Sequence, residues 1–149
     1  MKKLIVAAFF LGSFVCEVNA QTQFKVITTI ESIVPGGMGR SRIIENGTEI
    51  NYEEFTTERT DGKKSKQGDI KRGDAKVDMF KETKMLNFYS MAGINFQNIA
   101  SNDALTTSML NSLSSGGWEL FTVVSGVESD SGKGDGQGIF ITRYIFKKN

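Results

Sequence analysis

Apolar residues recur along the C-terminal third of the chain with the period of a helix. Leu105, Met109 and Leu113 are spaced four residues apart, which places them on one face of an α-helix, and Leu110 widens that face. Before them, Ser101-Asn102-Asp103 offers side chains that cap helix N-termini and an acid near the positive end of the helix dipole. We therefore predict a helix that begins at these three residues.

Gly116 and Gly117 mark the point where this helix should end, because glycine readily adopts the left-handed backbone that terminates helices. An alternating segment starts directly after them at Trp118 and predicts a strand. Regular alternation separates its side chains into two sets, Trp118, Leu120 and Val124 on one side and Glu119, Phe121 and Val123 on the other.

The segment Gly138–Lys147 predicts the last strand, and both of its faces are apolar. Its side chains divide into Ile139, Ile141 and Ile145 on one face and Phe140, Tyr144 and Phe146 on the other. A strand with one solvated face alternates with polar residues, so both faces of this sheet should be covered. The predicted helix can cover one face. We expect residues 80–99 or a second copy of the chain to cover the other.

The N-terminal half reads as short strands joined by turns. β-branched residues between Phe24 and Ile33 predict the first strand. Further along we expect a turn at Val34–Gly39, a second strand at Arg40–Ile44, a tight turn at Asn46-Gly47 and a weaker third strand at Glu49–Phe55. Thr56–Lys76 has only Ile70 and Ala75 as apolar side chains, so a mobile charged loop is expected at about residues 56–77.

Residues 80–100 are again rich in apolar side chains, but these side chains follow neither the helical nor the strand period. We predict a short strand at Met85–Ser90, followed by an irregular packed segment. Aromatic and methionine side chains of this kind belong more often to a core than to a ligand site. A pocket between the sheet and residues 80–99 is the alternative.

The first twenty residues have the pattern of a secretory signal peptide. Two lysines precede the apolar run Leu4–Val15, and small or modest side chains follow up to Ala20. Cleavage after Ala20 would leave a mature chain that starts at Gln21, exported to the periplasm or secreted. A lipoprotein signal acylated at Cys16 is less favoured, because bulky residues precede that cysteine.

The composition of this mature chain limits the kinds of binding and catalytic sites that it can form. It would have 129 residues, enough for one domain, with 16 basic and 16 acidic side chains, which gives no electrostatic reason to bind nucleic acid. No further apolar run reaches transmembrane length. Histidine is absent and the one cysteine lies in the signal, so histidine- or cysteine-dependent nucleophilic sites and the usual zinc sites are excluded. We expect no cofactor and no enzyme activity.

Two groups of residues remain as weak binding candidates. Glu128, Asp130 and Asp135 lie among glycines and offer the oxygen ligands that Ca²⁺ prefers, although their spacing is not that of an EF-hand. Arg40 and Arg42 share one face of a strand and could bind a carboxylate or phosphate. A solvated loop and a solvated strand face are the plainer interpretations of the two groups.

Part of the chain resembles a known family. Leu110-Asn111-Ser112-Leu113, then Gly117-Trp118-Glu119-Leu120, then the ending Tyr144–Lys148 are similar to the domain of unknown function 4177 family, with the strand from Phe24 as its opening strand. The resemblance covers about fifty residues and implies a β-α-β-β unit, here with a long insertion after the first strand. The chain is also similar to small exported proteins of Bacteroidetes-type bacteria. Neither resemblance implies an activity.

These observations together predict an α+β fold: an antiparallel sheet of about four or five strands with one main helix packed on a face. For function we expect an exported, non-enzymatic binding or assembly module that forms a homodimer or binds a protein partner. The alternative is a small-molecule binder of the cell envelope.

Overall fold

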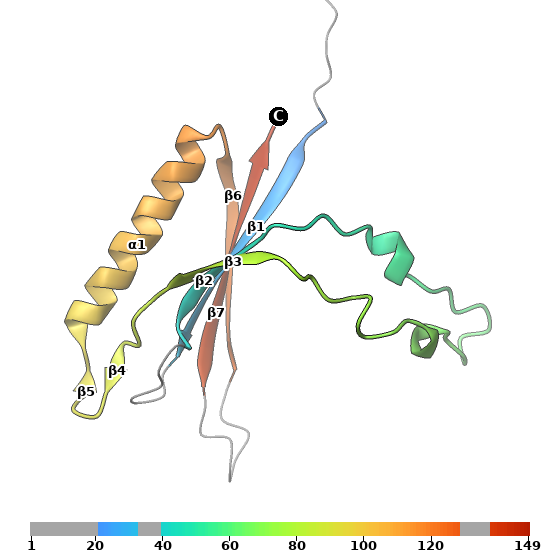
Figure 1. Cartoon of the computed structure of the whole chain (residues 1–149), viewed down its shortest axis with the longest axis horizontal. Coiled ribbons are helices and arrows are strands. Elements are labelled where there is room, and N and C mark those ends of the chain that lie inside the picture. Colours follow the sequence, from blue (N-terminus) through green and yellow to red (C-terminus); the bar gives the residue numbers. More distant parts are fainter. Residues whose placement is uncertain (1–20, 33–39, 129–137) are drawn as a thin grey trace, which may run out of the picture.

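The computed structural model of the chain describes residues 21–32, 40–128 and 138–149, and it is an α+β structure (Figure 1). One antiparallel sheet has the strand order β3-β2-β1-β7-β6. Its strands are β1 (Gln23–Ser32), β2 (Arg42–Asn46), β3 (Phe80–Lys84), β6 (Glu119–Glu128) and β7 (Ile139–Lys148). The other elements are the helix α1 (Phe96–Ser115), the short strands β4 (Tyr89–Ser90) and β5 (Gly93–Ile94), and the 3-10 turns η1 (Tyr52–Phe55) and η2 (Gln67–Asp69). The predicted class, a sheet of four or five strands with one main helix, is confirmed.

The centre of the sheet is the pair β1 and β7, which are antiparallel along all ten residues of each strand. Ile27 lies opposite Tyr144, and Thr29 opposite Thr142. Together with α1 and β6 these two strands form a β-α-β-β unit, the arrangement that the family resemblance implies. The long insertion after β1 supplies β2 and β3, which extend the sheet on the other side of β1.

The core lies between the sheet and α1. The buried apolar side chains of the described residues come from three strands and the segment after β3: Ile27, Ile43, Met85 and Phe146. From the helix, Leu105, Met109 and Leu113 pack against them, so the predicted apolar stripe faces the sheet. A core of this size is small for the length of chain, and it covers only one face of the sheet.

The helix begins earlier than predicted. Asn95, not Ser101, is the N-cap residue, and its side chain accepts a hydrogen bond from the Asn98 N–H. Asn102 lies in the interior of α1 and is buried, with 1% of its surface exposed. Its amide bonds to other parts of the chain, so its side chain is used in tertiary contacts and not for capping. Residue type alone therefore misplaced the start of the helix.

The end of the helix is as predicted. Gly116 is the C-cap, and Gly117 takes the left-handed backbone with φ of 82°. The N–H groups of Gly117 and Trp118 then donate to the carbonyl oxygens of Ser114 and Leu113 at 2.9 and 3.0 Å. These bonds satisfy helix carbonyls and turn the chain directly into β6.

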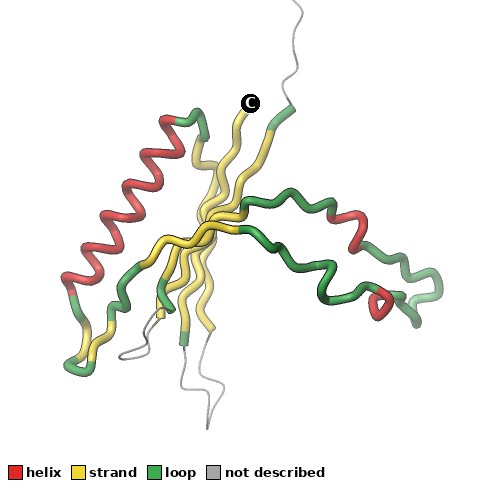
Figure 2. The backbone as a smooth tube through the Cα atoms, in the orientation of Figure 1, coloured by secondary structure: helices red, strands yellow, loops and turns green. Residues whose placement is uncertain are grey.

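The predicted hairpin after β2 is wrong. The Asn46 side chain accepts a hydrogen bond from the Thr48 N–H and donates one to the Thr48 carbonyl, which closes a local turn without reversing the strand. Glu49–Phe55 contains no strand and includes η1. The partner of β2 is β3, with Ile43 opposite Thr83, and residues 47–79 between them form a projecting arm (Figure 2).

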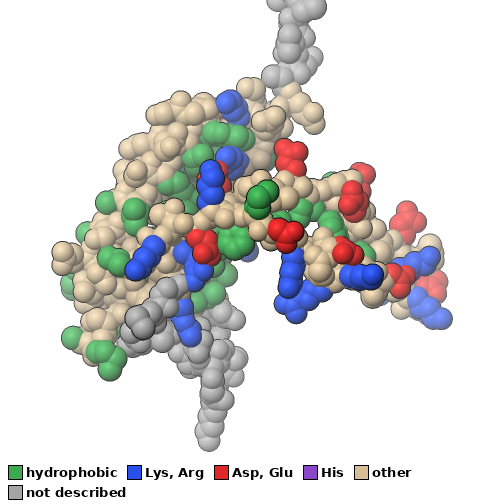
Figure 3. All heavy atoms as spheres, in the orientation of Figure 1, with side chains coloured by type: hydrophobic (Ala, Val, Ile, Leu, Met, Phe, Trp, Pro, Cys, Tyr) green, Lys and Arg blue, Asp and Glu red, His purple; other side chains and the backbone are tan. Residues whose placement is uncertain are grey.

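The arm carries most of the charged surface visible in Figure 3. Nearly all of its side chains are exposed, and its elements are short 3-10 turns and bends. Such a composition has little apolar surface to bury, which explains why it does not fold back on the sheet.

The strand predicted at Met85–Ser90 is also misplaced. The sheet strand in this region is β3, at Phe80–Lys84, an edge strand whose residues are all exposed. Because three of its five residues are charged, it has no apolar alternation to detect. Met85 is buried just after it, and the chain then runs on the α1 side of the sheet, where the Phe88 ring lies 5.9 Å from that of Phe140.

Candidate functional site

A β-bulge in β6 decides which side chains face which side of the sheet. Leu120 lies opposite Phe146, but Thr122 lies opposite Ile145, so one extra residue is inserted in β6. Beyond the bulge, Val123 pairs with Tyr144 and faces α1, whereas Val124 faces away. The sides predicted for Val123 and Val124 by regular alternation are therefore wrong, and they are exchanged by the bulge.

The face of the sheet opposite α1 is apolar and uncovered in the described structure. We call it the open face. Register places on it the apolar residues and threonine Phe24, Val26, Thr28, Ile30, Ile44, Val124, Ile139, Ile141 and Ile145. The charged residues Arg42, Glu82, Lys84, Glu119, Arg143 and Lys147 share this face. Phe121, at the bulge, lies on it through its contact with Phe24. Phe24, Phe121 and Val124 are 61, 57 and 55% exposed. The Phe24 and Phe121 rings meet edge to face at 5.9 Å on this face.

Neither neighbouring segment covers the open face. Residues 85–99 lie on the α1 side, because Phe88 contacts Phe140, which pairs with Glu31 in the register that faces the helix. The expectation that residues 80–99 cover the second face is therefore wrong. The arm lies on the opposite side of the sheet from α1, and it projects outward (Figure 1).

Ion pairs flank the open face at two corners. Arg42 Nη1 lies 2.6 Å from Glu82 Oε1, and Lys147 Nζ lies 3.4 Å from Glu119 Oε2. The guanidinium of Arg42 is thus already paired with a carboxylate. Arg40, the other predicted anion-binding residue, precedes β2 and is half-buried. Anion binding by Arg40 and Arg42 stays a prediction.

The calcium candidates fall mostly outside the described residues. Glu128 is the last residue of β6, and Asp130 and Asp135 lie in the part that is not described. Within residues 21–32, 40–128 and 138–149 no three carboxylates gather as a cation site. Calcium binding by this group stays a prediction.

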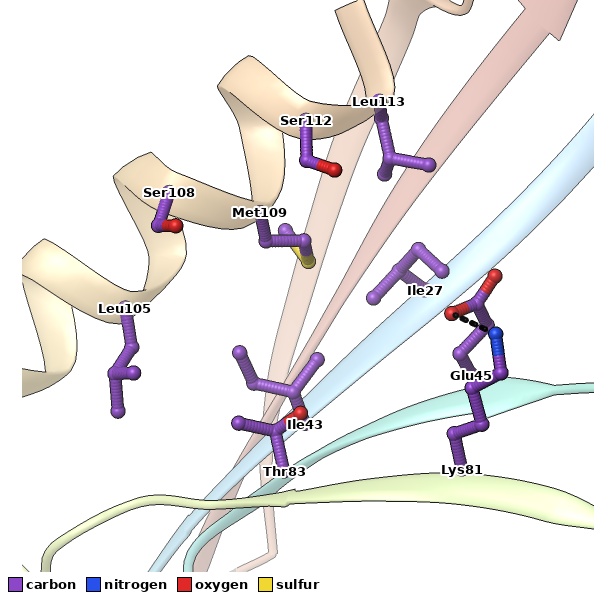
Figure 4. A pocket seen from close by; sticks show the side chains of 10 residues that line it. All are labelled: Ile27, Ile43, Glu45, Lys81, Thr83, Leu105, Ser108, Met109, Ser112 and Leu113. Carbon is purple, nitrogen blue, oxygen red and sulfur yellow. Dashed lines mark ion pairs between the residues drawn. The ribbon is translucent and has the colours of Figure 1, made fainter. Parts of the chain in front are cut away.

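A groove opens on the other side of the sheet, between α1 and the strands β1, β2 and β3 (Figure 4). Its volume is about 310 Å³. The lining side chains are Ile27, Ile43, Glu45, Lys81, Thr83, Leu105, Ser108, Met109, Ser112 and Leu113. The predicted pocket between the sheet and residues 80–99 shares only Lys81 and Thr83 with this groove, so α1 and not that segment forms its second wall.

Glu45 and Lys81 line one end of the groove, and Lys25 lies beside them. Lys25 Nζ donates a hydrogen bond to Glu45 Oε1 at 2.9 Å, and Lys81 Nζ lies 3.8 Å from Glu45 Oε2. The hydrogen bond from Lys25 lowers the pKa of Glu45, and it outweighs the opposing effect of burial. Lys25 also lies over the Trp118 ring, 5.1 Å from its centroid. The carboxylate therefore stays ionised and fixed at neutral pH.

Sequence reasoning did not foresee this charged group. Lys25, Glu45 and Lys81 lie on three different strands, and only the strand register brings them together. The pairing of β2 with β3 across the arm was the missing information. No local motif in the sequence marks it.

No family model, no curated protein and no solved structure matches this chain. The similarity to the domain of unknown function 4177 family therefore stays a prediction. Within the part of the chain that the structure describes, no helix is both long and apolar enough to cross a bilayer.

Proposed function

We propose that the protein is an exported, non-enzymatic assembly module that pairs with a second copy of itself through the open face. The observation that carries the proposal is the uncovered apolar surface formed by β1, β7 and β6 on the side away from α1. A contiguous apolar surface of this kind is unfavourable in water and is typical of an interaction site.

The size of the open face suits a dimer. The five strands contain forty residues. At about 3.3 Å per residue and about 4.8 Å between strands, the whole face, with the charged residues of β2 and β3 included, covers about 600 Å² on each copy. Two copies would bury about 1,200 Å² in total, which is at the lower end of stable interfaces. Face-to-face packing of two such sheets is a common arrangement in proteins.

A second copy also fits the distribution of apolar and charged groups. In a two-fold pair, the same patch lies on both sides of the interface, so apolar side chains meet apolar side chains. The ion pairs Arg42–Glu82 and Lys147–Glu119 lie toward the corners of the patch, where a polar rim is expected. The arm projects on this side of the sheet and would flank a bound copy.

The absence of histidine and cysteine from the expected mature chain supports a non-enzymatic role, because most nucleophilic and acid–base sites depend on them. The signal-like first twenty residues support export.

Size-exclusion chromatography with light scattering tests the proposal. We expect twice the mass of the chain at micromolar concentration and a reversible decrease on dilution. A single-chain mass at every concentration would reject self-association. A different protein bound to the open face would then be the competing explanation, and co-purification of a defined stoichiometric partner would favour it.

A further inference from the structure

The groove beside α1 is apolar along most of its length and charged at one end (Figure 4). Leu105, Met109 and Leu113 line its helix wall, and Ile27 and Ile43 form its floor. The distance along α1 from Leu105 to Leu113 is about 12 Å, at 1.5 Å per residue. A volume of about 310 Å³ lies at the lower end of small-molecule sites and holds about ten water-sized groups. The shape suits a short, extended apolar chain.

The charged end of the groove is lined by Glu45 and Lys81, and Lys25 lies beside it, outside the lining. Glu45 is the one carboxylate that lines the groove, and it lies between the ammonium groups of Lys25 and Lys81. Glu49 lies beyond it, in the neighbouring hollow that Lys25 lines. Lys25 holds Glu45 closely, whereas Lys81 is 3.8 Å away and its side chain is 80% exposed. Because Lys25 holds Glu45 closely, the exposed Lys81 ammonium, which makes only the longer contact to Glu45, is the charged group of the lining that can turn toward a ligand.

The rest of the rim is polar without charge. Ser108 and Ser112 on α1 and Thr83 on β3 contribute hydroxyl groups. Asp103 is the one charged residue of α1, and it does not line the groove. No second carboxylate among the lining residues opposes an anion at this end.

We propose that this groove binds a small amphiphilic monoanion, with its apolar chain along α1 and its carboxylate beside Lys81. The apolar floor accommodates the chain, and the exposed Lys81 ammonium, whose neighbour Glu45 is already held by Lys25, selects an anion over a cation or an alcohol of the same length. The groove and the open face lie on opposite sides of the sheet, so this proposal does not depend on self-association.

Calorimetric titration with decanoate, in a monomeric form below its micelle concentration, tests the proposal. We expect saturable binding with one molecule per chain. Octanoate should bind roughly tenfold more weakly, because two methylene groups leave the apolar wall. Decanol should bind about fivefold more weakly than decanoate, because it lacks the charge that meets Lys81.

Two pairs of variants locate the site. Ser108→Phe places a ring in the groove, and Thr107→Phe is its matched control, since Thr107 is exposed on the same helix and does not line the groove. Lys81→Ala removes the ammonium group that lines the groove. Its matched control is Lys84→Ala, which removes another ammonium group of β3 that lies on the open face. We expect Ser108→Phe to abolish binding, Lys81→Ala to weaken it about fivefold, and both controls to bind as the parent chain does.

Several results would overturn the proposal. These are no heat of binding at millimolar decanoate, equal affinity for decanoate and decanol, or equal affinity of Lys81→Ala and Lys84→Ala. Unchanged binding in Ser108→Phe would place the ligand elsewhere, for example on the open face. If Ser108→Phe fails to fold, as judged by circular dichroism, the exposed lysine pair still decides the question.

Discussion

The Asn102 side chain pairs with both backbone polar groups of Leu86. Its Oδ1 accepts a hydrogen bond from the Leu86 N–H at 2.9 Å, and its Nδ2 donates to the Leu86 carbonyl at 2.7 Å. The same Nδ2 donates to Glu31 Oε1 at 3.1 Å. One buried amide therefore connects α1, β1 and the segment after β3. The two hydrogen bonds between Asn102 and Leu86 resemble those between paired β-strands. They hold the irregular segment that follows β3 against the core.

Replacing Asn102 with alanine should destabilise the protein strongly. Two backbone groups of Leu86 would lose their partners, which costs about 3 kcal/mol in the free energy of unfolding. Asn111→Ala is the matched control on the exposed side of α1 and should change stability by less than about 0.5 kcal/mol. Urea denaturation followed by circular dichroism measures both variants. Similar losses in the two variants would refute the role of Asn102.

Tyr144 should ionise at unusually high pH. Burial raises the pKa of its phenol above the ordinary value near 10, and the nearby carboxylates of Glu31 and Asp103 add to this effect, against hydrogen bonds with Thr29 and Thr106. The unfolded chain ionises more readily than the folded one. Stability from this group is therefore complete below about pH 10 and is lost as the pH rises through the raised pKa.

The measurement is urea denaturation from about pH 8 to pH 11 for the parent chain and Tyr144→Phe. The difference between the two proteins isolates the contribution of the tyrosine to the change of stability with pH. The parent chain should lose more stability at the alkaline end than the variant does. An equal change in the free energy of unfolding with pH in the two proteins would contradict the raised pKa of Tyr144.

Gly117→Ala should destabilise the C-terminal end of α1. Gly117 has a φ of 82°, where a side chain is strained, and the substitution should cost about 1 kcal/mol of stability. Gly68→Ala is a suitable control, because that glycine lies in the arm with open space around it and ordinary φ. Thermal melts of the two variants should differ by a few degrees. Identical melting temperatures would argue against the left-handed turn.

The signal-peptide prediction is tested by the mass of the exported protein. Cleavage after Ala20 predicts a mature chain that starts at Gln21 and carries no lipid. Ala20→Phe should block cleavage, because signal peptidases require a small side chain there. A chain that begins at Cys16 with an added acyl mass would show a lipoprotein instead.

The sequence was a good guide where a pattern is local. The stripe of Leu105, Met109 and Leu113, the glycine end of α1 and the apolar strand β7 each follow from spacing along one element. The same is true of β1. These elements form the centre of the sheet and the core, which is why the fold class could be predicted.

The sequence was a poor guide where the outcome depends on distant residues. Asn102 has the residue type of a helix cap, yet its bonds to Leu86 place it inside α1. The charged strand β3 exists because β2 pairs with it across the arm. The bulge in β6 depends on register against β7 and exchanged the faces of Val123 and Val124. Both candidate surfaces, the open face and the groove, were therefore only partly foreseeable.

The neighbours Val123 and Val124 offer the most direct test of self-association. They are 46 and 55% exposed and face opposite sides of the sheet, so they match in residue type, strand and approximate exposure. Their cross-strand partners differ, Tyr144 for Val123 and Arg143 for Val124. Val124→Glu places a charge on the open face, and Val123→Glu places the same charge on the α1 side.

Sedimentation velocity over a range of concentrations compares the two variants with the parent chain. The account predicts that the parent chain and Val123→Glu are dimers and that Val124→Glu is a folded monomer. A dimer that survives Val124→Glu, or one that is lost equally in both variants, would contradict assembly through the open face.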